Sequence, residues 1–163
     1  MTRKAFYSFH YEPDNWRAGT VRGIGVIEGN QTVSDNEWEE ITSGGDSAIE
    51  AWIADQMKGK SCVIVLIGQN TAGRKWITHE IVEGWNTSKG LVGIHIHNLL
   101  DSGGSQALKG ANPFNHVTVK GQSMSSIVKT YDPPFADSKS VYRYIADNLE
   151  EWVEEAIAIR TEN

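Results

Sequence analysis

The chain has 163 residues, of which 39% are hydrophobic and 22% charged, so it can build the core of one ordinary domain. Fifteen Lys and Arg against 21 Asp and Glu give a formal net charge of −6, which argues against nucleic-acid binding and attachment to an anionic membrane. The one cysteine, Cys62, excludes an intrachain disulfide. With neither a secretory leader nor a long apolar span evident, we expect a cytoplasmic protein.

The N-terminal residues predict a buried strand followed by a helix. Residues 5–9 are mostly aromatic and end at a polar turn, which is typical of a short buried strand. Asp14 has the side chain of a helix cap, and we expect it to begin a helix that carries Arg17 and ends near Gly23. The apolar run over residues 24–27 predicts a second, weaker strand.

The next segment predicts a loop and then an amphipathic helix. Residues 30–45 are polar and predict a long loop with room for a short helix around Trp38. A helix is then expected from Asp46 or Ser47 until Gly59. Its apolar side chains recur at offsets of three and four, at Ala48, Ile49, Trp52, Ile53 and Met57.

The middle of the chain alternates strands with a helix. Residues 62–67 form a continuous apolar run, typical of a central strand that is covered on both faces. Residues 73–87 predict a helix, and residues 91–96 predict another strand. The stripe of that helix is formed by Ile77, Ile81 and Trp85. Residues 98–115 predict a long loop of the kind that is usually functional or mobile.

The C-terminal part predicts one more strand and a final helix. The strand is short and lies at residues 127–128. Ser138 or a neighbouring residue begins the helix, which covers about residues 138–160. Its inward positions are Val141, Ile145, Leu149, Trp152, Val153 and Ile157. Without an internal repeat or a low-complexity tract, we treat residues 1–163 as one domain.

This alternation of strands and helices predicts an α/β fold with a mainly parallel sheet. A five-stranded sheet in the flavodoxin-like order 2-1-3-4-5 is favoured over a barrel, because there are few strands. In that order, the strands at residues 5–9 and 62–67 are neighbours at the switch point, and ligands bind beyond the carboxyl ends of such strands. Three loops are therefore candidates for a site: residues 8–14, residues 68–74, and the segment from His97 onward.

Trp76 and Glu80 stand out within the predicted helix over residues 73–87. They are four residues apart, so they share one face of the helix. Glu80 also lies at the edge of the buried stripe, where a carboxylate can be half-buried beside an aromatic wall. Most glutamates at helix surfaces are simply solvated, so this spacing by itself is a weak indication of function.

Several motifs together resemble the Toll/interleukin-receptor (TIR) domains. Phe6-Tyr7-Ser8-Phe9 followed by Asp14 is similar to their first box, and Trp76-x-x-x-Glu80-Ile81 is similar to a later box. Ile77 stands where that later box usually has cysteine. The prokaryotic ThsB-type branch, from the Thoeris antiphage system, matches more of the chain, over about residues 4–135. The further matching stretches are residues 9–17, 45–53, 65–81, 93–98 and 110–114.

This resemblance implies a flavodoxin-like TIR fold and, in active members, cleavage of the N-glycosidic bond of NAD+. ThsB-type members convert NAD+ into a cyclic ADP-ribose isomer, which activates a separate effector protein in infected cells. The essential glutamate of the family corresponds to Glu80. NAD+ is then the substrate and not a resident cofactor, and self-association is left open. Our candidate substrate-binding residues are Phe6, Ser8, His10, Arg17, Thr71, Arg74 and Trp76.

The chemistry suits a site with one carboxylate. Breaking the ribosyl–nicotinamide bond passes through an oxocarbenium-like centre, whose charge a carboxylate stabilises. Nicotinamide is already a good leaving group, so a second carboxylate is dispensable. The candidates for stacking on a ring are Phe6, Tyr7 and Trp76. The candidates for binding the pyrophosphate are Arg17 and Arg74. Core packing is at least as good an explanation of the aromatic residues.

Two other function classes compete with this interpretation. A non-catalytic TIR-like signalling module would use the same fold for protein contacts, and an intact Glu80 favours the enzyme over it. A flavin carrier of the flavodoxin type is weakly supported, because no phosphate loop rich in Ser and Thr follows the first strand. His95 and His97 have the period-two spacing of a metal pair, but the sequence provides no third ligand, so we expect no metal site.

Overall fold

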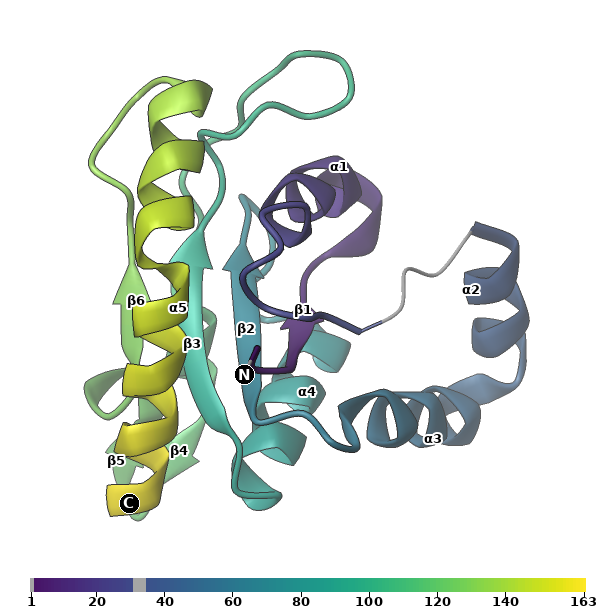
Figure 1. Ribbon diagram of the computed structural model, residues 1–163. Helices are drawn as coiled ribbons and strands as arrows, with labels where there is room; N and C mark the ends of the chain where they lie inside the picture. Colours follow the sequence, from purple (N-terminus) through teal and green to yellow (C-terminus); the bar gives the residue numbers. More distant parts are fainter. Residues whose placement is uncertain (1, 31–34) are drawn as a thin grey trace.

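Four parallel strands form the main sheet of the computed structural model, which describes residues 2–30 and 35–163 (Figure 1). Their order is β1-β2-β3-β6, and their bounds are β1 (Ala5–Ser8), β2 (Cys62–Ile67), β3 (Gly90–His95) and β6 (Lys129–Tyr131). Ser8 is in register with Val65, and Ile67 with His95. The carboxyl ends of these strands therefore meet at one edge of the sheet. A separate antiparallel pair joins β4 (Thr118–Val119) to β5 (Gln122–Ser123).

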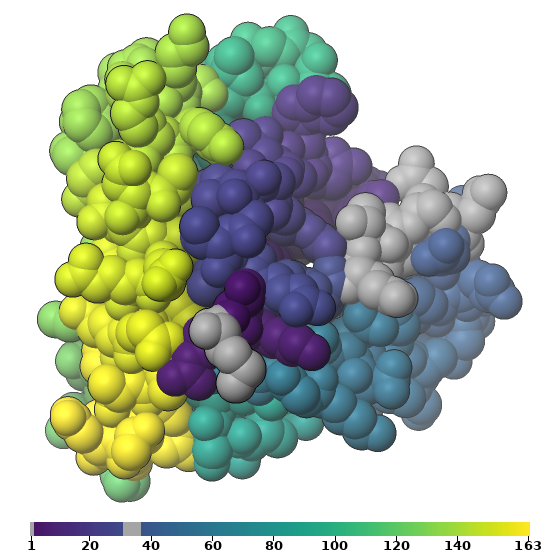
Figure 2. Space-filling view, viewed as in Figure 1, coloured from purple at the N-terminus to yellow at the C-terminus, as the bar shows by residue number. Residues whose placement is uncertain are grey.

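Helices cover both faces of the sheet. One core lies under α1 and α5, and the other lies under α3, α4 and the 3₁₀ turns, with α2 beside α3 (Figure 1). Figure 2 shows α5 along one side of the molecule, in yellow, and α2 and α3 at the opposite side, in blue. The bounds are α1 (Tyr11–Arg22), α2 (Asp35–Ser43), α3 (Gly45–Met57), α4 (Lys75–Asn86), α5 (Ser138–Glu162), η1 (Pro113–His116) and η2 (Met124–Ser126).

The predicted α/β fold of the flavodoxin-like TIR type is confirmed. The continuous apolar run in the sequence of β2 has a simple structural cause. All six residues of β2 are buried, because the two cores press on its two faces. The predicted helices at residues 73–87 and 138–160 correspond to α4 and α5. Asp137 caps α5 by accepting a hydrogen bond from the Ser140 amide at 2.9 Å. Among the described residues, no helix is both long and apolar enough to cross a membrane.

In the described part of the chain the main sheet has four strands, and the prediction of five is wrong. Residues 24–27 do not form the expected strand. Gly25 has a φ of +82°, which breaks the extended conformation, and Ile27 is buried against the core without strand pairing. An isolated parallel bridge between Lys4 and Glu28 is found beside β1. The outer edge of β1 is closed further by Asn30, whose Oδ1 accepts the amide of Tyr7 at 2.9 Å.

Two other predicted boundaries are also wrong. The last strand is β6 and not residues 127–128, because Ile127 and Val128 close a turn on the carbonyl of Met124 and pack inward. Asp14 does not cap α1, which begins at Tyr11. Its buried carboxylate instead receives a hydrogen bond from Arg17 inside the helix.

The predicted loop at residues 30–45 contains a longer helix than expected. The short helix expected around Trp38 is present as α2, which begins at Asp35. Residues 31–34, which fall within the same predicted loop, lie outside the described residues. The long segment after β3 is irregular as expected, but it is packed closely. A Cβ added at Gly110 would lie 2.1 Å from the carbonyl oxygen of Gly68, so the segment presses directly on the β2–α4 loop.

Candidate functional site

A cavity of about 1060 Å³ lies beside β1, near the carboxyl ends of the first strands. Its walls come from β1, α1, α2, α3, residues 69–70 and 72–77, and Glu80. The volume is at the upper end of what small-molecule sites usually provide, which is enough for a ligand of nucleotide or dinucleotide size. Two of the three predicted loops, at residues 8–14 and 68–74, contribute several lining residues, and the segment after His97 contributes Ala111.

Glu80 lies where the core meets this cavity. Its neighbours Ile77 and Ile81 point into the core, so α4 carries the Glu80 carboxyl to the border of the buried region. The side chain is 8% exposed, and it lines the cavity. Ser8 Oγ donates a hydrogen bond to Glu80 Oε1 at 2.6 Å. Burial raises the pKa of Glu80 to about 8, although the Ser8 hydrogen bond opposes the rise, so the uncharged carboxyl prevails at pH 7.

Two aromatic side chains accompany Glu80 in the cavity wall. Trp76 is half-buried one turn before Glu80 on α4, and the Lys75 ammonium lies 4.9 Å from the centre of its ring. Phe6 also lines the cavity but is only 1% exposed, because its ring packs in the core beneath α3 and α4. The wall thus provides one accessible ring, Trp76, next to the carboxyl of Glu80.

His10 and Arg74 add polar groups to the same cavity. His10 precedes α1, and its buried Nδ1 has no hydrogen-bond partner among the described residues. Burial, followed by the charge of Arg74, lowers the pKa of His10, so a neutral imidazole faces the cavity at pH 7. Arg74 is exposed at the start of α4, whose first turn has no acidic residue. The positive end of the α4 dipole therefore favours an anionic ligand at this wall.

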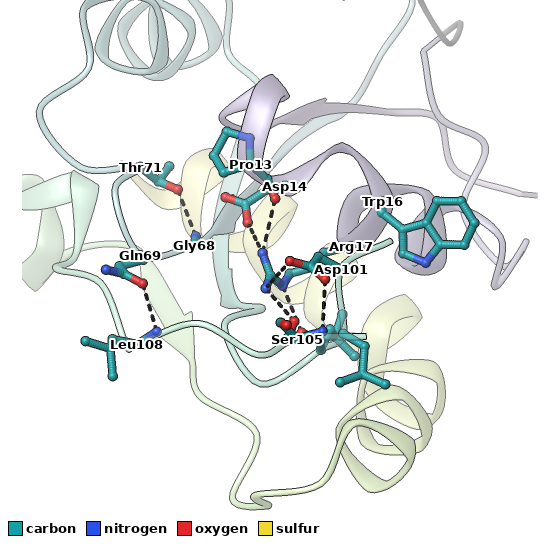
Figure 3. A network of polar contacts seen from close by, with 12 residues as sticks. Pro13, Asp14, Trp16, Arg17, Gly68, Gln69, Thr71, Asp101, Ser105 and Leu108 are labelled. Carbon is teal, nitrogen blue, oxygen red and sulfur yellow. Dashed lines mark hydrogen bonds and ion pairs between the residues drawn. The ribbon is translucent and has the colours of Figure 1, made fainter. Parts of the chain in front are cut away.

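Three of the eight candidate residues do not line the cavity. Ser8 is fully buried, and its hydroxyl is directed to Glu80. Thr71 is also fully buried, and its Oγ1 accepts a hydrogen bond from the Gly68 amide at 2.8 Å, which stabilises the β2–α4 loop. Arg17 is 3% exposed and lies on another side of α1 from Trp16 (Figure 3).

Arg17 joins α1 to the long segment after β3 (Figure 3). Its guanidinium donates to Asp14 Oδ1 at 2.8 Å, to the Leu99 carbonyl at 2.8 Å and to the Ser105 carbonyl at 2.9 Å. Arg17 Nη2 also lies 3.9 Å from Asp101 Oδ2. These partners occupy the guanidinium, so Arg17 fixes the segment against α1 and does not reach the cavity.

Sequence reasoning missed an array of four half-buried aromatic side chains in the cavity wall. We call it the aromatic array, and it consists of Phe9, Tyr11, Trp38 and Trp52. Successive ring centres are 6.2 Å, 6.5 Å and 5.7 Å apart. The sequence feature that could have indicated this array is Trp38, a large aromatic residue within a polar segment. Trp52 was assigned only to the buried face of α3.

His95 and His97 lie at the carboxyl end of β3 and are nearly buried, with ring centres 5.8 Å apart. Burial lowers the pKa of His95 to about 4, so it is neutral at pH 7. Across residues 2–30 and 35–163, no group of three His, Cys, Asp or Glu side chains is arranged to hold a metal ion. The two histidines do not line the cavity beside β1.

Comparison with known proteins identifies the family. The model of the family described as "Thoeris protein ThsB, TIR-like domain" matches residues 6–101. A Bacillus cereus (strain MSX-D12) protein named "Putative cyclic ADP-D-ribose synthase ThsB1" is 31% identical over 122 residues, and the match covers 72% of this chain. The chain spans 64% of the length of that relative. The family match covers more than half of the chain, from β1 through the Glu80 helix to the start of the long segment, so the chain belongs to the ThsB family of TIR-like domains.

Proposed function

We propose that this protein cleaves the bond between nicotinamide and ribose in NAD+ and releases a cyclic ADP-ribose isomer. The observation that carries the proposal is the Glu80 carboxyl, which is buried at the wall of a dinucleotide-sized cavity and oriented by Ser8. Family membership and the name of the Bacillus cereus relative support it. The product would act on a separate effector protein, in the cytoplasm, as part of Thoeris antiphage defence.

The cavity provides groups for the reacting half of NAD+. Trp76, on the same helix face as Glu80, offers a ring against which nicotinamide can stack. Arg74 and the amino end of α4 provide positive charge for the pyrophosphate. In this arrangement the nicotinamide riboside lies by Glu80, and the pyrophosphate lies at the start of α4.

Bond cleavage then needs only one carboxylate. The nicotinamide nitrogen leaves with the bonding electron pair, and positive charge develops at the ribose carbon. Glu80 in its ionised form stabilises this charge. A hydroxyl of the adenosine half can attack the carbon and lose its proton to water, or an adenine ring nitrogen can attack through its lone pair, after which the exocyclic amine loses a proton. Either attack closes the cyclic product. Attack by water instead gives linear ADP-ribose.

The raised pKa of Glu80 fits a site that is charged only when substrate binds. The free protein keeps the carboxyl neutral at pH 7, because burial disfavours the anion. NAD+ brings a pyridinium cation beside the carboxyl, and a nearby positive charge favours the ionised form. Binding of the substrate thus produces the charge that the reaction requires.

The test is to incubate the purified protein with NAD+ and to resolve the products by mass. We expect release of nicotinamide together with a product that has lost water relative to ADP-ribose. Glu80→Gln keeps the shape of the side chain and removes its charge, so turnover should fall by about 10²–10⁴-fold. Circular dichroism checks that this variant stays folded.

The purified protein can be inactive without a signal from infection, so the assay is repeated with an extract of phage-infected cells. Turnover of the Glu80→Gln variant at the wild-type rate would overturn the assignment of Glu80. If no NAD+ is consumed under either condition, the non-catalytic signalling module is the better explanation.

A further inference from the structure

The aromatic array is larger than the reacting half of NAD+ requires. Glu80 and Trp76 lie on α4, whereas Trp38 and Trp52 belong to α2 and α3. All of them line one cavity. The array therefore adds aromatic surface to the cavity from helices other than α4, which carries Glu80.

Core packing accounts for only part of this array. Trp52 packs against the core beneath α3 and α4, so its ring also has a structural role. Trp38 reaches that core through Trp52, whose ring centre is 5.7 Å away at an angle of 70°. On its other side, Trp38 stacks loosely on Tyr11, with ring centres 6.5 Å apart and planes 26° apart. Half-buried rings at these separations leave area that faces the cavity.

We propose that Trp38 and Trp52 form the subsite for the adenine base. This assignment rests on the proposed NAD+-cleaving function. A purine offers a large flat face, and stacking on aromatic side chains is a common way in which proteins bind bases. Nicotinamide belongs beside Glu80, because the bond that breaks must be within reach of the carboxyl. The adenine half is then the part of the dinucleotide left for the array.

The positive start of α4 supports the same division of the cavity. The pyrophosphate links the two halves of NAD+, and Arg74 lines this cavity together with both groups of aromatic residues. Lys75 forms an ion pair with Asp46 at the start of α3, so this surface contact links the α4 and α3 walls. A dinucleotide can thus bind with a base at each end and its charge at α4.

The experiment measures binding of the two halves separately, in protein that need not be turning over. Calorimetry with AMP probes the adenine half, and calorimetry with nicotinamide mononucleotide probes the other half. Trp38→Ala should weaken AMP binding by about 10- to 100-fold, as the loss of one base–aromatic stack does. Binding of nicotinamide mononucleotide should change less than twofold. Trp38→Phe should recover most of the AMP affinity.

The control is Tyr142→Ala, which removes an exposed aromatic ring from α5, outside the cavity. It should bind AMP as the wild type does. Equal AMP affinity in wild type and Trp38→Ala would overturn the subsite. An equal loss of affinity for AMP and for nicotinamide mononucleotide would overturn it too. Since AMP binding requires no catalysis, a protein that binds AMP through Trp38 but never cleaves NAD+ contradicts the proposed function and leaves this subsite standing.

Discussion

Two groups of aromatic residues lie at opposite ends of the sheet and pack differently. Beside β6 is an aromatic cluster whose centre is buried and whose outer ring, Phe135, is 43% exposed; it consists of Tyr131, Phe135, Tyr144 and Trp152. At its centre Tyr131 and Trp152 stack at 4.3 Å with their planes 8° apart, and Trp152 is 6% exposed, whereas the other two ring pairs are 5.8 Å apart. In the aromatic array beside β1, neighbouring rings are 5.7–6.5 Å apart, and each is half-buried.

The difference shows which aromatic residues are available to a ligand. Rings that stack closely on each other in the core have their faces covered by the protein itself, as Trp152 of α5 does against Tyr131. Rings that are spaced apart and border a cavity keep a face for another molecule, as Trp38 does on α2. Composition alone does not separate the two, because both clusters use the same residue types.

The largest effect on stability is expected from removing the ring of Trp152. Trp152→Ala should lower the free energy of unfolding by about 3–5 kcal/mol, because it leaves a cavity between α5 and the sheet. Trp38→Ala should cost only about 1 kcal/mol, because much of its ring already faces open space. Urea denaturation of both variants measures the two costs. Similar costs for the two substitutions would contradict the contrast between the clusters.

A second effect on stability is expected from pH and not from a substitution, through the Glu80 carboxyl, which is buried in the cavity wall. The folded-state pKa of Glu80 is about 8 and its ordinary value is 4.5, so the folded protein holds a proton that the unfolded chain has lost between these pH values. The contribution of Glu80 to the free energy of unfolding is therefore fully present below about pH 4.5. It falls as the pH rises toward 8, by up to about 1.4 kcal/mol per pH unit.

The control for this effect is Glu80→Gln, which cannot titrate at this position. Subtracting its unfolding free energy from that of the wild type at each pH isolates Glu80 from the histidines, whose own titration raises stability with pH. The difference should decline until about pH 8 and then level off. Parallel curves for the two proteins would show that Glu80 is not held neutral.

A small effect on stability, similar to that of Trp38→Ala, is expected from Ser8→Ala. Loss of the hydrogen bond to Glu80 should cost about 1 kcal/mol. The same hydrogen bond lowers the pKa of Glu80, so removing it should move the rising limb of kcat/KM to higher pH. Ser8→Thr keeps a hydroxyl and is the matched control. An unchanged pH profile in Ser8→Ala would contradict a role of Ser8 in setting the charge of Glu80.

The sequence predicted best those features that depend on local periodicity. The continuous apolar run of β2 and the four-residue spacing of Trp76 and Glu80 both follow from burial along one element. Features that depend on contacts across the fold were missed. Asp14 has the side chain of a cap, but its carboxylate accepts a hydrogen bond from Arg17, whose guanidinium also donates to the distant carbonyls of Leu99 and Ser105. Trp38 takes its place in the cavity wall only because α2 folds back toward Tyr11.

Strand boundaries failed for a related reason. Apolar composition indicates which residues are buried, and Ile27 and Val128 are indeed buried, but neither belongs to a strand. The pairing residues of β6 are polar or aromatic, because an edge strand is partly open to solvent. Hydrogen bonding between distant backbone segments leaves little trace in a single sequence.

The closure of the β1 edge by Asn30 also affects how the protein avoids aggregation. An open strand edge presents backbone groups on which a strand of another molecule can pair. Here the Ala5 amide donates to the Glu28 carbonyl at 2.8 Å, and the Tyr7 amide donates to Asn30 Oδ1 at 2.9 Å. Because a side chain stands in for a neighbouring strand, this edge is a poor template for intermolecular pairing. The sheet can therefore end beside a ligand cavity without inviting edge-to-edge assembly.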